Sequence, residues 1–234
     1  MFTGLVEEKG VLIARHAIGP AAVLKFRTTL GPLVVGESIA VDGVCLTVVR
    51  PAHGTGGAGG FEADVSSETL SRTTLGSAAI GSAVNLERSL TLSARLGGHL
   101  VSGHVDCICR LLARRPALSP GKGGGSRSSV ALTFGIPAPL GRFIAEKGSV
   151  AVNGVSLTVN AVGDTSFDVM VIPHTAEVTS LGSLGVGDSA NLEVDLLARY
   201  VARLMDRTAD GRADDDDGDT NAVWMDRLKE SGML

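Results

Sequence analysis

Ser38-Ile-Ala-Val-Asp-Gly-Val-Cys-Leu-Thr-Val48 decides the fold, because the chain repeats this stretch as Ser149-Val-Ala-Val-Asn-Gly-Val-Ser-Leu-Thr-Val159. Eight of the eleven positions are identical. Asp-Gly or Asn-Gly between β-branched residues is a strong signal for a two-residue turn of type I′, whose central residues need a positive φ. Each copy is therefore predicted to be a β-hairpin.

The two faces of this hairpin differ in character. A two-residue turn pairs Ile39 with Leu46 and Ala40 with Cys45, and side chains alternate between the faces. One face is therefore apolar. The other face carries small residues, which are Ser38, Ala40, Cys45 and Thr47 in the first copy and Ser149, Ala151, Ser156 and Thr158 in the second. A solvent-facing side more often holds charged residues, so this face indicates the floor of a pocket. The alternative, that these are simply good strand formers, stays open.

The repeat extends beyond the hairpin. Residues 61–87 align without a gap on residues 167–193, with eleven of twenty-seven positions identical, and the triplet Asn85-Leu-Glu87 recurs as Asn191-Leu-Glu193. The two openings match more weakly. Short strands are expected near residues 2–15, 21–28, 37–49, 61–67 and 83–88 and at their counterparts. Their spacing predicts an all-β barrel or sandwich for each half. Short helices are expected around 67–75 and 175–181, and a turn of helix between 87 and 98.

Composition excludes several classes of protein. The chain has 234 residues, enough for two domains, and its net charge of −4 forms no basic stripe that would bind nucleic acid. No apolar run approaches the roughly 18 residues of a membrane-spanning helix, and no signal peptide is recognised at the start. Cys45, Cys107 and Cys109 form neither a disulfide framework nor a zinc motif. The cytoplasm is the expected location.

The clearest helix pattern follows the second half. An apolar stripe at helical spacing is formed by Leu197, Tyr200, Val201 and Leu204. It predicts packing on the chain's own barrel or contact with another subunit, and the length of the stripe favours the second. The predicted organisation is thus 1–97 and 98–194 for the two halves, 195–207 for this helix, and 208–234 for an acidic, flexible tail.

Two patterns that could indicate dinucleotide binding or metal binding are rejected. Gly54-Thr-Gly-Gly-Ala-Gly59 has the letters of a dinucleotide fingerprint, but a strand is expected directly after it instead of a helix. His99 and His104 lack a third metal ligand.

The differences between the two copies are more informative than these motifs, since Leu5, Gly36, Cys45 and Glu68 become His104, Lys147, Ser156 and His174. Chemistry at one pocket and simple drift explain these changes equally well.

Four stretches resemble the signatures of the riboflavin synthase α-chain family. They are Met1-Phe-Thr-Gly-Leu-Val6, Val44-Cys-Leu-Thr-Val48, Gly97-Gly-His-Leu-Val-Ser-Gly-His104 and Gly154-Val-Ser-Leu-Thr-Val159. The resemblance implies two tandem Greek-key β-barrels and a C-terminal helix that assembles a homotrimer. It also implies a transferase that dismutates two molecules of 6,7-dimethyl-8-ribityllumazine into riboflavin and 5-amino-6-(D-ribitylamino)uracil. It implies no metal or redox cofactor, and it makes lumazine synthase a candidate partner.

The resemblance also implies which residues line two lumazine pockets. For the first barrel they are Gly4, Leu5, Val6, Cys45, Leu46, Thr47, Asp64, Val65, Ser66, Ser67, Glu68 and Thr69. For the second barrel they are Gly103, His104, Val105, Lys147, Ser156, Leu157, Thr158, Met170, Val171, Ile172, Pro173, His174 and Thr175. Phe2, Ser38, His99 and Asp195 stand where the family has residues near the site.

Four of these residues are the candidate catalytic groups. His104 is the candidate proton shuttle, because an imidazole titrates near neutral pH. Ser156 and Thr158 are expected to bind and polarise one pteridine, and Cys45, together with Thr47, the other. A non-catalytic, fluorescent lumazine- or flavin-binding protein of the same fold is the main alternative. A flavin reductase barrel would need a nicotinamide domain, which the chain does not contain.

Overall fold

The computed structural model of the protein describes residues 1–52, 59–117, 129–209 and 229. They form two units, residues 1–196 and the part of 197–234 that is described. Most of the Gly54–Gly59 motif and of the predicted acidic tail lies outside the described residues. Both halves of the repeat belong to the first unit.

The duplicated hairpins form as predicted. In the first copy, β3 (Ser38–Val41) pairs with β4 (Val44–Thr47), and Ala40 lies opposite Cys45. In the second copy, β10 (Ser149–Val152) pairs with the start of β11 (Val155–Val162) in the same register. Both turns have positive φ at their two central residues, which confirms the type I′ turns.

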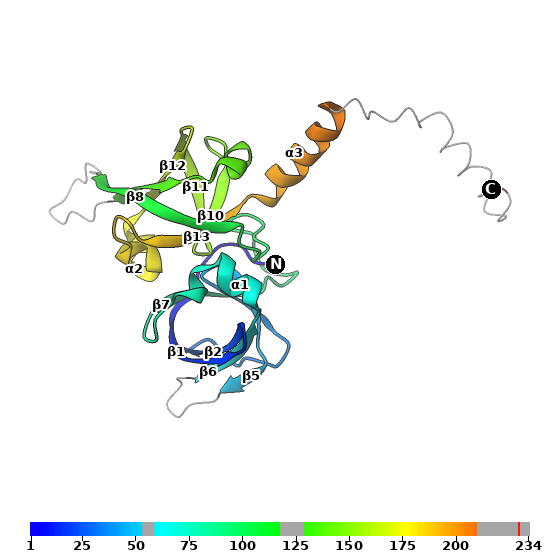
Figure 1. Cartoon of the computed structure of the whole chain (residues 1–234), viewed down its shortest axis with the longest axis vertical. Coiled ribbons are helices and arrows are strands. Elements are labelled where there is room, and N and C mark those ends of the chain that lie inside the picture. The colour runs from blue at the N-terminus through cyan, green and yellow to red at the C-terminus, as the bar shows by residue number, and fades with distance from the viewer. Residues whose placement is uncertain (53–58, 118–128, 210–228, 230–234) are drawn as a thin grey trace. The chain divides into compact units, whose positions relative to one another are not determined.

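The first half is a seven-stranded antiparallel sheet in the order β4-β3-β7-β1-β2-β6-β5. The further strands are β1 (Glu8–Ile18), β2 (Ala21–Thr28), β5 (Arg50–Ala52), β6 (Gly59–Val65) and β7 (Ala83–Arg88). Its two end strands, β4 and β5, are separated in the chain only by residues 48 and 49, so the chain itself links the ends of the sheet. Figure 1 shows the sheet curled on itself.

The second half is a closed barrel in the order β10-β11-β12-β9-β8-β13. Its remaining strands are β8 (Cys107–Ala117), β9 (Ser129–Gly135), β12 (Ser166–Val171) and β13 (Ser189–Val194). Here the single strand β11 takes the place of β4 and β5. The predicted fold class, two tandem barrels related by duplication, is confirmed (Figure 1).

Each barrel has its own hydrophobic core. The predicted apolar hairpin face, Ile39, Val41, Val44, Leu46 and Val48, lies in the first core. Phe26 and Phe61 pack there at a ring separation of 5.1 Å, and Phe134 and Phe167 pack in the second core at 5.7 Å. Burial of such side chains is the main stabilising contribution to folding.

The structure corrects several predicted boundaries. The first strand begins at Glu8 instead of residue 2, because residues 2–6 follow a separate path to the other barrel. The short helices are α1 (Ser67–Arg72) and α2 (Pro173–Val178), each followed by a 3₁₀ turn, η2 (Thr74–Gly76) and η4 (Ser180–Ser183). A further 3₁₀ segment is η3 (Ala138–Phe143). α2 starts earlier than predicted because proline suits a first helical position. Residues 89–98 form no helix, but they contain a hydrogen-bonded turn, in which the N–H of Ala94 donates to the carbonyl oxygen of Thr91.

The two barrels meet at a seam with its own small core, made of Phe2, Ala40, Val101 and Ala151. Phe2 and Val101 form an isolated antiparallel bridge across it. Ala40 and Ala151 were predicted to lie on a pocket floor, but they are 3% and 1% exposed. The small residues of that hairpin face therefore allow the barrels to approach each other, in addition to any role in a pocket.

The predicted C-terminal helix is α3 (Leu196–Ala209). The side chains of its apolar stripe are each more than half exposed in the single chain. No helix in the described part of the chain is long and apolar enough to cross a membrane.

Candidate functional site

The opening segment of each half crosses to the hairpin of the other half. The carbonyl oxygen of Gly4 accepts a hydrogen bond from the backbone N–H of Ser156, at 2.8 Å. The carbonyl oxygen of Gly103 accepts one from the backbone N–H of Cys45, also at 2.8 Å. Val6 packs against the second core and Val105 against the first. Residues 4–6 thus lie at the second barrel and residues 103–105 at the first, the reverse of the barrels to which the resemblance assigned them.

Glycine is required where the segments cross. Gly4 and Gly103 have φ values of +75° and +82°, in the left-handed region that favours glycine. A Cβ atom on Gly4 would lie 2.6 Å from Cβ of Ser156, and one on Gly103 would lie 2.5 Å from Cβ of Cys45. The repeated glycines thus allow each segment to lie directly on the opposite hairpin.

Because the opening segments cross, each barrel has candidate side chains from both halves of the chain. The first barrel combines Cys45 and Thr47 with His104, whose side chain is exposed. The second barrel combines Ser156 and Thr158 with Leu5. Cys45 and Ser156 are half-buried, and Thr47 and Thr158 are exposed. Each barrel therefore presents a small polar pair next to a segment that the other half supplies.

The buried His99 and the half-buried Ser156 form a polar pair. Nδ1 of His99 lies 2.7 Å from Oγ of Ser156, within hydrogen-bonding distance. Burial lowers the pKa of His99, and the negative charge of Asp195 raises it in part. The net lowering favours a neutral imidazole. Nε2 of His99 is buried and has no hydrogen-bond partner in the described structure. This arrangement brings His99 and Asp195, which the resemblance placed only near the site, together with the candidate catalytic residue Ser156.

Several expected site residues have side chains that point into the protein. Phe2 lies in the seam, and Leu46, Leu157 and Val171 lie in the barrel cores. Contact between these residues and a ligand would therefore involve the backbone. Val65 also belongs to the first core, but together with the exposed Asp64 and Ser66 it lines a cavity of about 460 Å³, whose other lining residues are Ile18, Ala21 and Ala22. The remaining expected site residues differ in burial. The exposed ones are Ser67, Glu68, Met170, Ile172 and His174, and the half-buried ones are Thr69, Pro173 and Thr175. Ser38 lies in β3 opposite Thr47.

Lys147 has an unusual backbone for a lysine. Its φ is +64°, and Gly36, its counterpart in the first half, has φ +88°. A positive φ strains most residues other than glycine. An exposed lysine at such a position is a signal of function, because the structure alone would favour glycine there.

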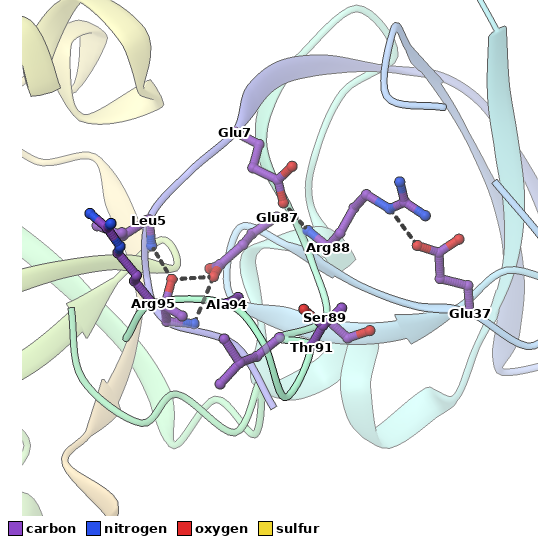
Figure 2. A pocket seen from close by; sticks show the side chains of 11 residues that line it. Leu5, Glu7, Glu37, Glu87, Arg88, Ser89, Thr91, Ala94 and Arg95 are labelled. Atoms are coloured by element: carbon purple, nitrogen blue, oxygen red, sulfur yellow. Dashed lines mark hydrogen bonds and ion pairs between the residues drawn. The ribbon is translucent and has the colours of Figure 1, made fainter. Parts of the chain in front are cut away.

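A second cavity, of about 470 Å³, lies beside Thr3 and Leu5 (Figure 2). Charged residues line it, among them Glu37, Glu87, Arg88 and Arg95. Glu37 and Arg88 form an ion pair of 2.5 Å. The carboxylate of Glu87, labelled in Figure 2, accepts hydrogen bonds from the backbone N–H and the hydroxyl of Thr3.

Sequence reasoning missed Glu87 and its counterpart Glu193. Both are buried, and both hold a crossing segment in place. The recurrence of Asn-Leu-Glu at 85–87 and 191–193 was the available signal. Within the described residues, no three His, Cys, Asp or Glu side chains are grouped as metal ligands would be.

Known proteins share this architecture. Residues 3–89 and 102–195 each match the lumazine binding domain, so the chain is a protein of two lumazine-binding domains. The riboflavin synthase of Mycobacterium tuberculosis (strain ATCC 25618 / H37Rv) is 46% identical over 213 residues, which cover 88% of this chain and 98% of that protein. The riboflavin synthase of Photobacterium phosphoreum is 37% identical over 237 residues and covers 100% of both. The chain belongs to the riboflavin synthase family.

A solved structure supports the fold. LumP complexed with riboflavin matches with a TM-score of 0.68 at 21% identity, over 83% of this chain and 99% of that chain. The match covers both barrels in tandem and shows the fold alone.

Proposed function

We propose that the protein forms riboflavin from two molecules of 6,7-dimethyl-8-ribityllumazine by transfer of a four-carbon unit, with release of 5-amino-6-(D-ribitylamino)uracil. The observation that carries this proposal is the duplicated site. Each barrel has a small polar hairpin face completed by a glycine-containing segment of the other half. Two similar sites are what a reaction between two molecules of the same compound requires.

The two sites contribute mainly by holding the reactants. Fixing two molecules in reacting geometry can supply roughly 7–11 kcal/mol of the barrier. The C7 methyl group of one lumazine is acidic because its carbanion is delocalised into the pteridine. After loss of that proton, this carbon forms a bond to C7 of the other molecule. A second carbon–carbon bond then closes the new ring, and the two ring C–N bonds of the donor molecule break, so that its four carbons stay in riboflavin and 5-amino-6-(D-ribitylamino)uracil leaves. His104 is exposed at the first barrel and takes the role of proton shuttle.

The hydroxyl-bearing residues of the second barrel have a different role. Ser156 and Thr158 bind and polarise the second pteridine, and the hydrogen bond between Ser156 and His99 fixes the orientation of the serine hydroxyl. Cys45 and Thr47 take the equivalent place in the first barrel. Cys45 acts as a weak polar contact through its half-buried thiol.

A homotrimer would bring sites of different subunits together. The exposed apolar stripe of α3 supports assembly, because an apolar stripe of this length is unfavourable in water. We further propose a cytoplasmic location, which agrees with three free cysteines, and lumazine synthase as a partner that supplies the substrate.

Incubation of the purified protein with the lumazine tests the function. We expect one riboflavin for every two lumazines consumed. A fluorescent binding protein would instead bind the lumazine and change its emission without forming riboflavin. The identity of 46% and 37% to riboflavin synthases, compared with 21% to LumP, favours the enzyme. Absence of riboflavin from the folded protein at saturating lumazine would refute it.

A further inference from the structure

Two buried carboxylates occupy the same position in the two halves of the repeat. Glu87 lies on β7 and is 5% exposed, and Glu193 lies on β13 and is 4% exposed. Neither forms an ion pair with any side chain in the described part of the chain. Burying a charged group without compensation is costly, so such a residue is expected to have a specific partner.

Each carboxylate binds one short segment through three hydrogen bonds. Glu87 accepts from the Thr3 N–H at 2.6 Å, the Thr3 hydroxyl at 2.7 Å and the Gly4 N–H at 3.0 Å. Glu193 accepts from the Ser102 N–H at 2.7 Å, the Ser102 hydroxyl at 2.7 Å and the Gly103 N–H at 3.0 Å. The same arrangement is thus built twice from different residues.

In each segment, the hydroxyl that donates to the glutamate also accepts a hydrogen bond from the backbone two residues further along the chain. Oγ1 of Thr3 accepts the N–H of Leu5 at 3.2 Å, and Oγ of Ser102 accepts the N–H of His104 at 3.1 Å. Thr3 thus links Glu87 to the backbone of Leu5, and both of these residues are labelled in Figure 2. The backbone of His104, the candidate proton shuttle, is therefore connected to Glu193 through a single side chain.

The segments held in this way are those that cross between the barrels. Gly103 accepts the hydrogen bond of Cys45, and Gly4 accepts that of Ser156. Glu193 belongs to the second barrel, yet it fixes a segment at the first barrel's hairpin. Glu87 belongs to the first barrel and fixes a segment at the second barrel's hairpin.

We propose that Glu87 and Glu193 are positioning residues, each of which sets the geometry of the lumazine site in the opposite barrel. Glu193 places His104 beside Cys45, and Glu87 places Leu5 beside Ser156. The proposal rests on the proposed function. A carboxylate is required because both of its oxygens accept, whereas the amide of a glutamine would turn a donor toward a backbone N–H.

The test compares Glu193→Gln with Glu87→Gln in the full chain by amide hydrogen exchange, read at Cys45 and Ser156. Glu193→Gln is expected to speed hydrogen exchange of the Cys45 amide by about tenfold and to leave the exchange rate of the Ser156 amide unchanged. Glu87→Gln is expected to do the reverse. Each variant should also lower kcat by about tenfold or more, because small misplacements of reacting groups are costly.

Glu8→Gln is the matched control. Glu8 also accepts hydrogen bonds from several groups, on Thr28, Thr29 and Leu30, but it contacts neither crossing segment. This variant should leave kcat and the exchange rates of the Cys45 and Ser156 amides unchanged. If a Glu193 variant does not fold, Ser102→Ala can be used instead. It removes the hydroxyl that connects Glu193 to the backbone of His104 but keeps the carboxylate, and it should also speed exchange of the Cys45 amide.

Equal acceleration at both amides in one variant would overturn the proposal, because it would indicate general loosening. Acceleration at the expected amide with unchanged kcat would also overturn it. Absence of riboflavin formation by the wild-type protein would refute the proposed function instead, and the exchange experiment distinguishes the two because it does not depend on activity.

Discussion

Nδ1 of His99 lies 2.7 Å from Oγ of Ser156, although 57 residues separate them in the chain. The pair links the segment between the barrels to the hairpin of the second barrel. Replacing Ser156 with alanine leaves Nδ1 of a buried histidine without its partner and removes a hydroxyl from the site. We expect Ser156→Ala to lower kcat by about tenfold or more in a riboflavin-formation assay.

Ser183→Ala is a suitable control for this prediction. The Ser183 hydroxyl donates to the Ser180 carbonyl within one 3₁₀ turn and belongs to no candidate pocket. Its loss should leave kcat unchanged. Ser156→Cys, which reproduces the residue of the first copy, should retain more activity than the alanine variant. Full activity of Ser156→Ala would rule out the assigned role.

His104→Leu converts this position to the residue of the other half, Leu5. If His104 moves a proton, the variant loses about 10²-fold or more in kcat, because leucine can neither accept nor donate it. The measurement is the initial rate of riboflavin formation between pH 5 and pH 9. A loss much smaller than tenfold would show that another group transfers the proton.

Asp42 predicts a pH dependence of stability. Burial in the seam raises the pKa of Asp42 from 3.8 to about 7, and hydrogen bonds from Asn85 and Ser180 lower it in part. Because the folded state holds the proton more tightly than the unfolded state, this contribution to stability is full below about pH 4. It is lost as the pH rises to about 7, with a slope of at most about 1.4 kcal/mol per pH unit.

Asp42→Asn should remove this slope, since Asn153 occupies the equivalent turn and makes equivalent hydrogen bonds. The measurement is the free energy of unfolding in urea at several pH values, as the difference between variant and wild type. Asp164→Asn, in an exposed turn, should leave the slope unchanged. An identical pH profile for Asp42→Asn and the wild type would contradict the assignment.

The apolar stripe of α3 predicts assembly through this helix. Replacing Leu197 and Leu204 with lysine should shift the mass in solution from three times the chain mass of 23.9 kDa to the chain mass itself. Light scattering during size-exclusion chromatography measures this shift. Arg203→Gln, on the same helix but off the stripe, should leave the assembly intact. A wild-type protein of 23.9 kDa in solution would refute the trimer.

Local patterns predicted much of the fold. The type I′ turns and the hairpin register followed from Asp42-Gly43 and Asn153-Gly154, because few residues tolerate a positive φ. The buried faces followed from alternation along the strands. The resemblance supplied the candidate site residues, but it did not indicate that Gly4 lies at the second barrel and Gly103 at the first.

The sequence by itself determined that one barrel is present twice and which hairpin face enters each core, because turn chemistry and side-chain alternation act over a few neighbouring residues. The tertiary structure alone decided that each half completes the site of the other. The contacts of Gly4 with Ser156 and of Gly103 with Cys45 depend on how the barrels pack at the seam, and so does the separation between His99 and Ser156. No short-range pattern encodes the path of a segment from one barrel to the other.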